Sequence, residues 1–195
     1  MIDNIELIKP SLQFNSKDDY HFLQVLQRKK DRDKIPFKLG GSNNNSRLIK
    51  AYYIESVEYL EERYDEIKAL CDLFHARAGI CLNRRSYKSS SLQMMIRLAQ
   101  SIQSENYRNM AMWNNVSGVY QPVKDKVWLI DIDTKEKKYI KQINLCIGNA
   151  QPFGDKTIAN IPSKSGVHLI TKPFNKLEFN NLFNVLMIKV LEIHK

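Results

Sequence analysis

Apolar residues in this chain alternate between two spacings, and this pattern restricts the fold more than any other feature of the sequence. A spacing of two is typical of a β-strand, and spacings of three and four are typical of a helix with one buried face. Strand patterns occupy residues 48–54, 77–83, 127–133 and 166–172, and helix patterns occupy 57–74, 92–102 and 175–190. Residues 139–147 fit either state. We therefore expect an α/β or α+β fold.

The expected architecture is a mixed sheet with helices packed mainly on one face, which leaves the other face or an edge free for a site. The apolar stripe of helix 92–102 is expected to pack on that sheet. Ser16 followed by Asp19 predicts a short capped helix running to about residue 26. Residues 40–45 have the composition of a flexible loop. We thus expect a helical arm and loop over residues 1–45 and an α/β domain over residues 46–195.

The net charge suggests an anionic partner. The 195 residues carry a formal charge of +9, with a pI near 9.4. Such an excess attracts phosphates and releases counterions on contact, so nucleic acid is the expected partner. The alternative is a solvated, lysine-rich surface without a specific ligand.

Neither secretion nor membrane insertion is expected. No apolar stretch is long enough to span a bilayer, and the first ten residues lack the pattern of a signal peptide. We expect a cytoplasmic protein that does not contact membranes. Three cysteines lie far apart among apolar neighbours and form no C-x-x-C motif, which favours a role in the core.

Two acids close the strand pattern of residues 127–133. Side chains two apart in a strand share a face, so Asp131 and Asp133 should point the same way. Paired carboxylates can hold hard cations such as Mg²⁺ or Mn²⁺, which leave positions open for phosphate oxygens. Alternatively, the acids form a turn and pair with nearby lysines.

A small, hydroxyl-rich and basic turn precedes the strand pattern of residues 166–172. Backbone N–H groups, hydroxyls and cations in such a turn can cradle a phosphate, and a histidine can donate a further hydrogen bond. The candidate phosphate-binding residues are Ser163, Lys164, Ser165, Gly166, His168 and Lys172. Alternatively, His168 is a structural strand residue.

An Asp-x-Asp strand end, followed some thirty residues later by a Ser-x-x-Gly-x-His turn and strand, resembles the archaeo-eukaryotic primase superfamily, including phage and plasmid primase-polymerases. The resemblance covers roughly Arg77 to Lys172. It implies that Asp131 and Asp133 bind catalytic metals, and that Ser163 or Ser165 together with His168 contacts nucleotide phosphates. It also implies a role in DNA replication. We further expect the domain to have a core like that of an RNA-recognition motif (RRM).

The sequence departs from this family in one respect. The family supplies a third acid on a later strand, whereas the carboxylates after His168 are Glu178 and Glu192, both in the last helix pattern. Glu178 is expected to cap that helix with Asn175. A degenerate relative, or one that acts with a replication partner protein, therefore remains open.

A second basic segment follows the strand pattern of residues 77–83. Arginine matches phosphate geometry and tyrosine stacks on bases, so this segment is a candidate nucleic-acid contact. Its residues are Arg84, Arg85, Tyr87 and Lys88. The alternative is a solvated helix entry.

Three functions follow from these features. The first is a metal-dependent nucleotidyltransferase that uses a nucleoside triphosphate, with Asp131, Asp133 and His168 as catalytic residues. The second is a non-catalytic nucleic-acid-binding accessory module with an RRM-like sheet. The third is a metal-dependent nuclease.

Overall fold

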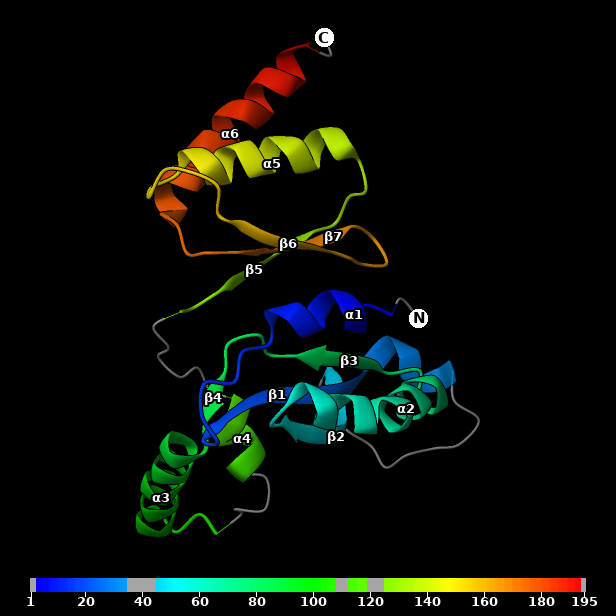
Figure 1. Cartoon of the computed structure of the whole chain (residues 1–195), viewed down its shortest axis with the longest axis vertical. Coiled ribbons are helices and arrows are strands. Elements are labelled where there is room, and N and C mark those ends of the chain that lie inside the picture. The colour runs from blue at the N-terminus through cyan, green and yellow to red at the C-terminus, as the bar shows by residue number, and fades with distance from the viewer. Residues whose placement is uncertain (1–2, 35–44, 108–111, 119–124, 194–195) are drawn as a thin grey trace. The chain divides into compact units, whose positions relative to one another are not determined.

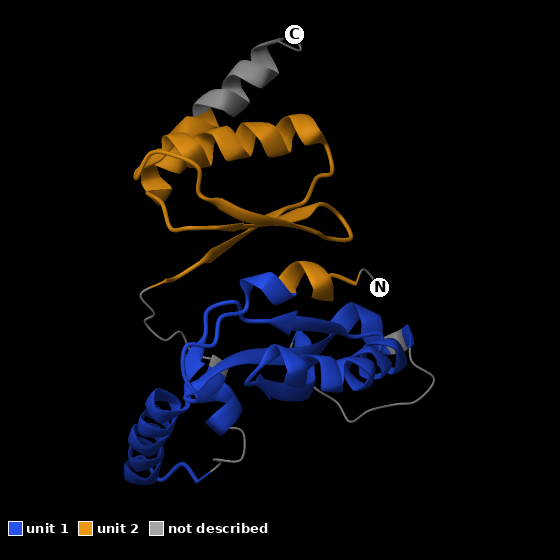
Figure 2. Cartoon of the chain, viewed as in Figure 1, with its two compact units in different colours: residues 1, 9–124 blue, residues 2–8, 125–195 orange. Residues whose placement is uncertain are grey.

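The computed structural model describes residues 3–34, 45–107, 112–118 and 125–193. The chain forms two compact units, shown in Figure 2. The first contains residues 1 and 9–124, and the second contains residues 2–8 and 125–195. The boundary predicted at residues 40–45 lies almost entirely outside the described residues.

The first unit is built on an antiparallel sheet with strand order β2-β1-β3, and β4 pairs with the start of β1. Its strands are β1 (Asp19–Arg28), β2 (Ser46–Ile54), β3 (Arg77–Ile80) and β4 (Arg85–Ser86). Its helices are η1 (Lys9–Ser11), η2 (Lys29–Lys34), α2 (Val57–Leu73), α3 (Tyr87–Gln103) and α4 (Met112–Gly118). The strands and α-helices of this unit are labelled in Figure 1.

The second unit has an antiparallel sheet with strand order β5-β7-β6. Its elements are α1 (Ile5–Ile8), β5 (Trp128–Ile132), α5 (Lys137–Asn149), β6 (Thr157–Pro162), β7 (Val167–Thr171) and α6 (Lys176–Ile193). Helices α5 and α6 pack on one face of this sheet (Figure 1), where Ile132, Ile147 and Leu169 belong to one core cluster.

The prediction of a fold that mixes helices and strands is confirmed. The strands predicted near residues 48–54, 77–83, 127–133 and 166–172 and the helices near 57–74, 92–102 and 175–190 are all present. The prediction of one mixed sheet is wrong, because the described residues contain two sheets, each antiparallel. An RRM-like core is not confirmed.

The helix predicted from Ser16 is also wrong, because Asp19–Arg28 forms strand β1. The Asp19 carboxylate accepts hydrogen bonds from the N–H groups of Asn15 (2.8 Å) and Ser16 (3.1 Å), as it would in a helix cap, yet here these bonds close a turn. Strand β1 lies between β2 and β3 and buries Tyr20 to Leu23 consecutively, which hides the alternation expected of a strand.

The apolar stripe of α3 does not pack on a sheet, contrary to prediction. Leu92, Met95 and Ile102 are 52%, 66% and 54% exposed. The face of α3 that turns inward carries the buried Ser90, whose hydroxyl lies 2.7 Å from that of Tyr20.

Two of the three cysteines meet the expectation of a core role. Cys71 and Cys146 are buried, whereas Cys81 is half-buried, and all three are free thiols. Burial raises the pKa of both Cys71 and Cys146.

Within the described part of the chain, no helix is both long and apolar enough to cross a membrane.

Gly166 lies against the backbone at the end of β5. A Cβ atom at this position would lie 1.7 Å from the Ile132 carbonyl oxygen and 2.7 Å from the Thr134 nitrogen. Both obstacles are backbone atoms, so a side chain here requires β5 and β7 to separate. Glycine at 166 therefore permits the two strands to meet at this end of the sheet.

We predict that Gly166→Ala destabilises the second unit by at least about 2 kcal/mol, because overpacking against a backbone cannot relax by side-chain rotation. Gly148→Ala is the matched control, since the nearest atom to its added Cβ is the Gly154 carbonyl oxygen at 3.8 Å. In helix α5 this control should be neutral or stabilising by up to about 1 kcal/mol. Urea denaturation measures both, and equal stability of the two variants would contradict the prediction.

Candidate functional site

The pairing of β5 with β7 brings Asp131 and His168 together. The two residues are direct cross-strand partners. The His168 Nε2 atom lies 3.2 Å from the Asp131 Oδ1 atom, and the side chains are 36% and 59% exposed. Sequence analysis placed these residues in one site, and the strand register brings them into contact.

Asp133 lies beside the turn that joins β6 to β7. The Ser165 hydroxyl donates a hydrogen bond to the Asp133 Oδ1 atom over 2.9 Å. Within the turn, the Ser163 N–H donates to the Gly166 carbonyl oxygen (2.9 Å), and the Gly166 N–H donates to the Ser163 hydroxyl oxygen (3.0 Å). These bonds fix the turn, so that both aspartates, His168 and Ser165 gather at one end of the sheet.

Strand alternation separates this cluster from the hydrophobic core. Ile130 and Ile132 join the core with α5 and α6, whereas Asp131, between them, points to the opposite face. On that face the strand is exposed at Leu129 and Asp131. The Asn4 side-chain amide, just before α1, donates to the Pro162 carbonyl oxygen (2.8 Å), which holds the N-terminal segment at the end of β6. In the cluster, Asp131, Asp133 and Ser165 are exposed and His168 is half-buried, so the cluster is accessible.

The two lysines predicted to bind phosphate differ in position. Lys164 is exposed within the turn, adjacent to Ser165. Lys172 is also exposed but lies four residues beyond His168, past the opposite end of β7. A strand of that length spans about 13 Å. The structure therefore places Lys164 near the cluster and Lys172 away from it.

The donor set fits a hard cation only in part. Two carboxylates suffice for Mg²⁺ when water and substrate phosphates supply the remaining ligands. In the described part of the chain, no group of three or more His, Cys, Asp or Glu side chains is arranged to hold a metal ion. Asp131 and Asp133 are the two carboxylates of this cluster that could bind a divalent cation.

Glu178 does not supply the third acid. Its carboxylate accepts hydrogen bonds from the Gln151 N–H (2.7 Å) and the Asn175 side-chain amide (2.9 Å) at the start of α6. The Asn175 side-chain oxygen in turn accepts from the N–H groups of Leu177 (3.0 Å) and Glu178 (3.3 Å). The predicted capping role of this pair is confirmed. The side chain of Glu192 lies outside the described residues.

The basic segment at β4 and the start of α3 belongs to the first unit, and much of it makes intramolecular contacts. The Arg84 Nε atom lies 3.6 Å from the Asp19 carboxylate. Arg85 is buried, with its guanidinium 3.4 Å from the Cys81 sulfur. Tyr87 stacks on Tyr20 with a ring-centroid distance of 4.4 Å.

Two further contacts of this segment involve the acids Glu55 and Asp18. The Tyr87 hydroxyl donates to the Glu55 carboxylate over 2.8 Å, and burial together with this contact raises the tyrosine pKa. The Lys88 N–H donates to Asp18 over 2.8 Å, while its side chain is exposed. These contacts give Arg85 and Tyr87 structural roles, and a nucleic-acid contact at Arg84, Arg85, Tyr87 and Lys88 stays a prediction.

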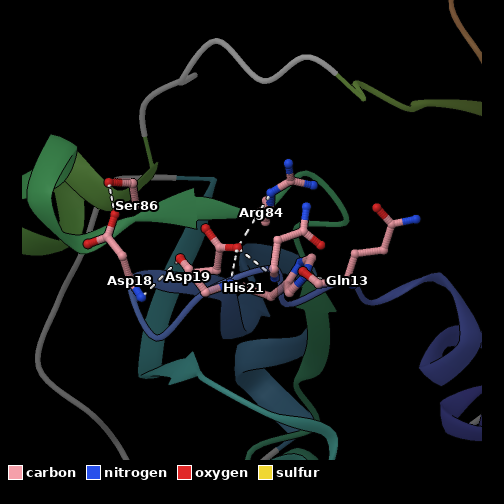
Figure 3. A network of polar contacts seen from close by, with 8 residues as sticks. Gln13, Asp18, Asp19, His21, Arg84 and Ser86 are labelled. Carbon is pink, nitrogen blue, oxygen red and sulfur yellow. Dashed lines mark hydrogen bonds and ion pairs between the residues drawn. The ribbon is translucent and has the colours of Figure 1, made fainter.

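Sequence analysis missed a polar network around His21 in β1 (Figure 3). His21 is fully buried. Its Nδ1 atom lies 2.9 Å from the Cys81 carbonyl oxygen, and its Nε2 atom lies 3.1 Å from the Gln13 carbonyl oxygen and 3.3 Å from the Gln13 nitrogen. A neutral imidazole protonated on Nδ1 would donate to Cys81 and accept from the Gln13 N–H. Burial lowers the pKa of His21, which favours this neutral form. Asp19 and Arg84 are the charged groups that act on it.

The network joins the segment before β1 to the start of α3. The Ser86 hydroxyl donates to the Asp18 carboxylate and accepts from the Ser89 N–H (3.0 Å) as the cap of α3. The first of these bonds, with the Lys88 N–H, lowers the pKa of Asp18. The only sequence signal for the network was one histidine inside an apolar run, so the sequence did not show which residues would meet it.

Comparison with protein-family models, with curated proteins and with solved structures finds no match to this chain. The interpretation of the site therefore depends on its own residues and geometry.

We predict that the first unit loses stability as the pH falls below about 6.5, because the unfolded chain then binds a proton at His21 that the folded chain resists. The free energy of unfolding continues to fall with pH until the pH reaches the lowered pKa of His21 in the folded chain. In His21→Gln, urea denaturation at pH 7.5 and pH 5 should show a smaller difference in unfolding free energy than in the parent chain. His75→Asn, at an exposed site, is the control. An undiminished pH difference in His21→Gln would contradict the role of this residue.

Proposed function

We propose that this protein is a metal-dependent nucleotidyltransferase of the primase type, which acts on nucleic acid and a nucleoside triphosphate. The observation that carries the proposal is the cluster formed by Asp131 and His168, which are paired across β5 and β7, and by Asp133 directly after β5. The cluster combines two carboxylates, a histidine and a hydroxyl-bearing turn, and this set of groups suits metal-assisted phosphoryl chemistry.

In this proposal Asp131 and Asp133 hold Mg²⁺ or Mn²⁺. The ion neutralises charge on the transferring phosphoryl group when bound. His168, whose Nε2 atom lies 3.2 Å from Asp131, would donate a hydrogen bond to a phosphate oxygen of the bound nucleoside triphosphate. Ser165 and Lys164 border the cluster and contribute a hydroxyl and a positive charge.

The proposed reaction joins a 3′-hydroxyl group to a nucleoside triphosphate and needs no further reactant. The 3′-hydroxyl oxygen of the primer or first nucleotide bonds to the α-phosphorus of the triphosphate. The bond between that phosphorus and the bridging oxygen breaks, pyrophosphate leaves, and the hydroxyl proton passes to solvent. The charge of +9 supports binding of the polyanionic template.

We also propose a cytoplasmic location for this protein and a role in DNA replication. A cytoplasmic protein that acts in DNA replication, including that of a phage, would have access to template and nucleotides. Because the cluster has two acids, a replication partner protein would supply additional ligands or template contacts.

A second candidate function is non-catalytic nucleic-acid binding by an accessory module. It is favoured by the absence, among the described residues, of a three-residue group that could hold a metal. Under this candidate, positive charge alone drives binding, and the aspartates serve only to order the end of the sheet.

We predict that Asp131→Asn combined with Asp133→Asn weakens Mg²⁺-dependent nucleoside triphosphate binding by at least about tenfold, equivalent to about 1.4 kcal/mol, and abolishes nucleotide incorporation. The cause is the loss of both carboxylate ligands. Isothermal titration calorimetry measures the first effect, and primer extension on labelled template measures the second.

The matched control is Glu136→Gln with Asp155→Asn, which removes the same charge from exposed sites in the same unit. It should bind and extend like the parent chain. Equal incorporation by the two double variants would refute the proposal. Shortening of the labelled strand would instead indicate a metal-dependent nuclease.

The second candidate makes a separate prediction. Binding to a single-stranded oligonucleotide should weaken linearly on a logarithmic salt scale, with a slope of about −0.7 per phosphate contact, and EDTA should leave it unchanged. Fluorescence anisotropy measures both. The nucleotidyltransferase proposal requires in addition that triphosphate binding is lost in EDTA, so triphosphate binding that persists there would contradict it.

A further inference from the structure

Helix α3 has an inverted distribution of side chains. The face that turns toward the rest of its unit carries Tyr87, Ser90, Met94 and Ser101, which are buried or half-buried. The opposite face is apolar and exposed. A helix that only completed its own unit would show the reverse arrangement, with apolar residues inward.

The exposed face is a continuous stripe, which we call the α3 stripe. Its residues are Leu92, Met95, Ile96, Ala99 and Ile102, with Leu98 beside it. The five large side chains are exposed by between 38% and 66%. Together they form an apolar patch on the order of 500 Å², comparable to the largest patch found on a typical monomer and often functional.

We propose that the α3 stripe is a dimer interface, in which α3 packs antiparallel on α3 of a second copy of this chain. Four positions of the stripe follow the a and d positions of a seven-residue repeat: Leu92 and Ala99 at a, Met95 and Ile102 at d. This is the spacing at which two helices pack along a shared seam.

The antiparallel direction follows from side-chain size. In an antiparallel pair each a position faces a d position of the other helix. Leu92 then faces Ile102 of the partner subunit, and Met95 faces Ala99 of the partner subunit. A large residue meets a small one in the central layers, which fills the seam without overpacking.

Charge favours the same direction. Lys88 continues the stripe at its N-terminal end, and Glu105 lies just beyond its C-terminal end. An antiparallel pair places Lys88 near Glu105 of the partner subunit and near the partner helix's C-terminal carbonyls, which attract cations. A parallel pair would instead place two Lys88 side chains together.

The area is sufficient for a weak, specific dimer. Two stripes in contact bury on the order of 1,000 Å², near the lower limit for a specific interface. The two-fold arrangement uses the same surface on both copies, so the assembly closes at two.

Sedimentation equilibrium of the full chain at up to about 100 µM, where an interface of this size should be populated, tests the proposal. The parent chain should reach twice the monomer mass. Met95→Lys should reduce self-association at least tenfold, whereas Gln93→Lys, exposed but off the stripe, should not. Both variants change exposed positions, so circular dichroism should report unchanged folding. A monomeric parent chain, or equal association of the two variants, would overturn the proposal.

Disulfide trapping tests the direction. The double variant Leu92→Cys, Ile102→Cys should form a covalent dimer on mild oxidation. Within one helix these positions lie about 15 Å apart, too far to bridge internally. Leu92→Cys alone should not cross-link in an antiparallel pair. Cross-linking by this single variant, above the background of the parent chain's three thiols, would overturn the antiparallel arrangement.

Discussion

The contact on which the candidate site depends is the close approach of Gly166 to the carbonyl oxygen of Ile132. Because residue 166 has no side chain, β5 and β7 remain paired up to the last residue of β5. The pairing sets Asp131 opposite His168, and the turn before Gly166 brings Ser165 to Asp133. A polar cluster that spans more than thirty residues of sequence thus results from one backbone contact and one strand register.

Local sequence signals identified many of the elements but not their arrangement. The strand ending in Asp131 and Asp133 and the strand containing His168 both had clear patterns, and each is present. Their adjacency depends on the order β5-β7-β6, which the chain reaches by passing β6 before returning to the centre. Nothing in either strand's own residues encodes that order, so contact between Asp131 and His168 remained an expectation until the fold was known.

The errors have physical causes that particular residues illustrate. Strand β1 was predicted to be a helix because Ser16 and Asp19 have the spacing of a helix cap, and because the residues that follow show no strand alternation. In the structure the Asp19 carboxylate closes a turn instead, and Tyr20 to Leu23 are buried in succession. The α3 stripe was expected to face the sheet because periodicity reveals an apolar face but not what covers it. Arg85 and Tyr87 looked like ligand contacts, yet one is buried beside Cys81 and the other bonds Glu55. A basic-aromatic segment alone does not distinguish these roles.

The central claim is that Asp131, Asp133 and His168 hold a divalent cation and the phosphates of a nucleotide at one end of the second sheet. Paramagnetic broadening of backbone NMR signals by Mn²⁺ in the presence of a nucleoside triphosphate tests this most directly. The account predicts strong broadening at residues 131–133 and 165–168, and much weaker broadening at Thr157 and Lys172, at the opposite end of the sheet. Uniform broadening, or broadening centred elsewhere, would contradict it.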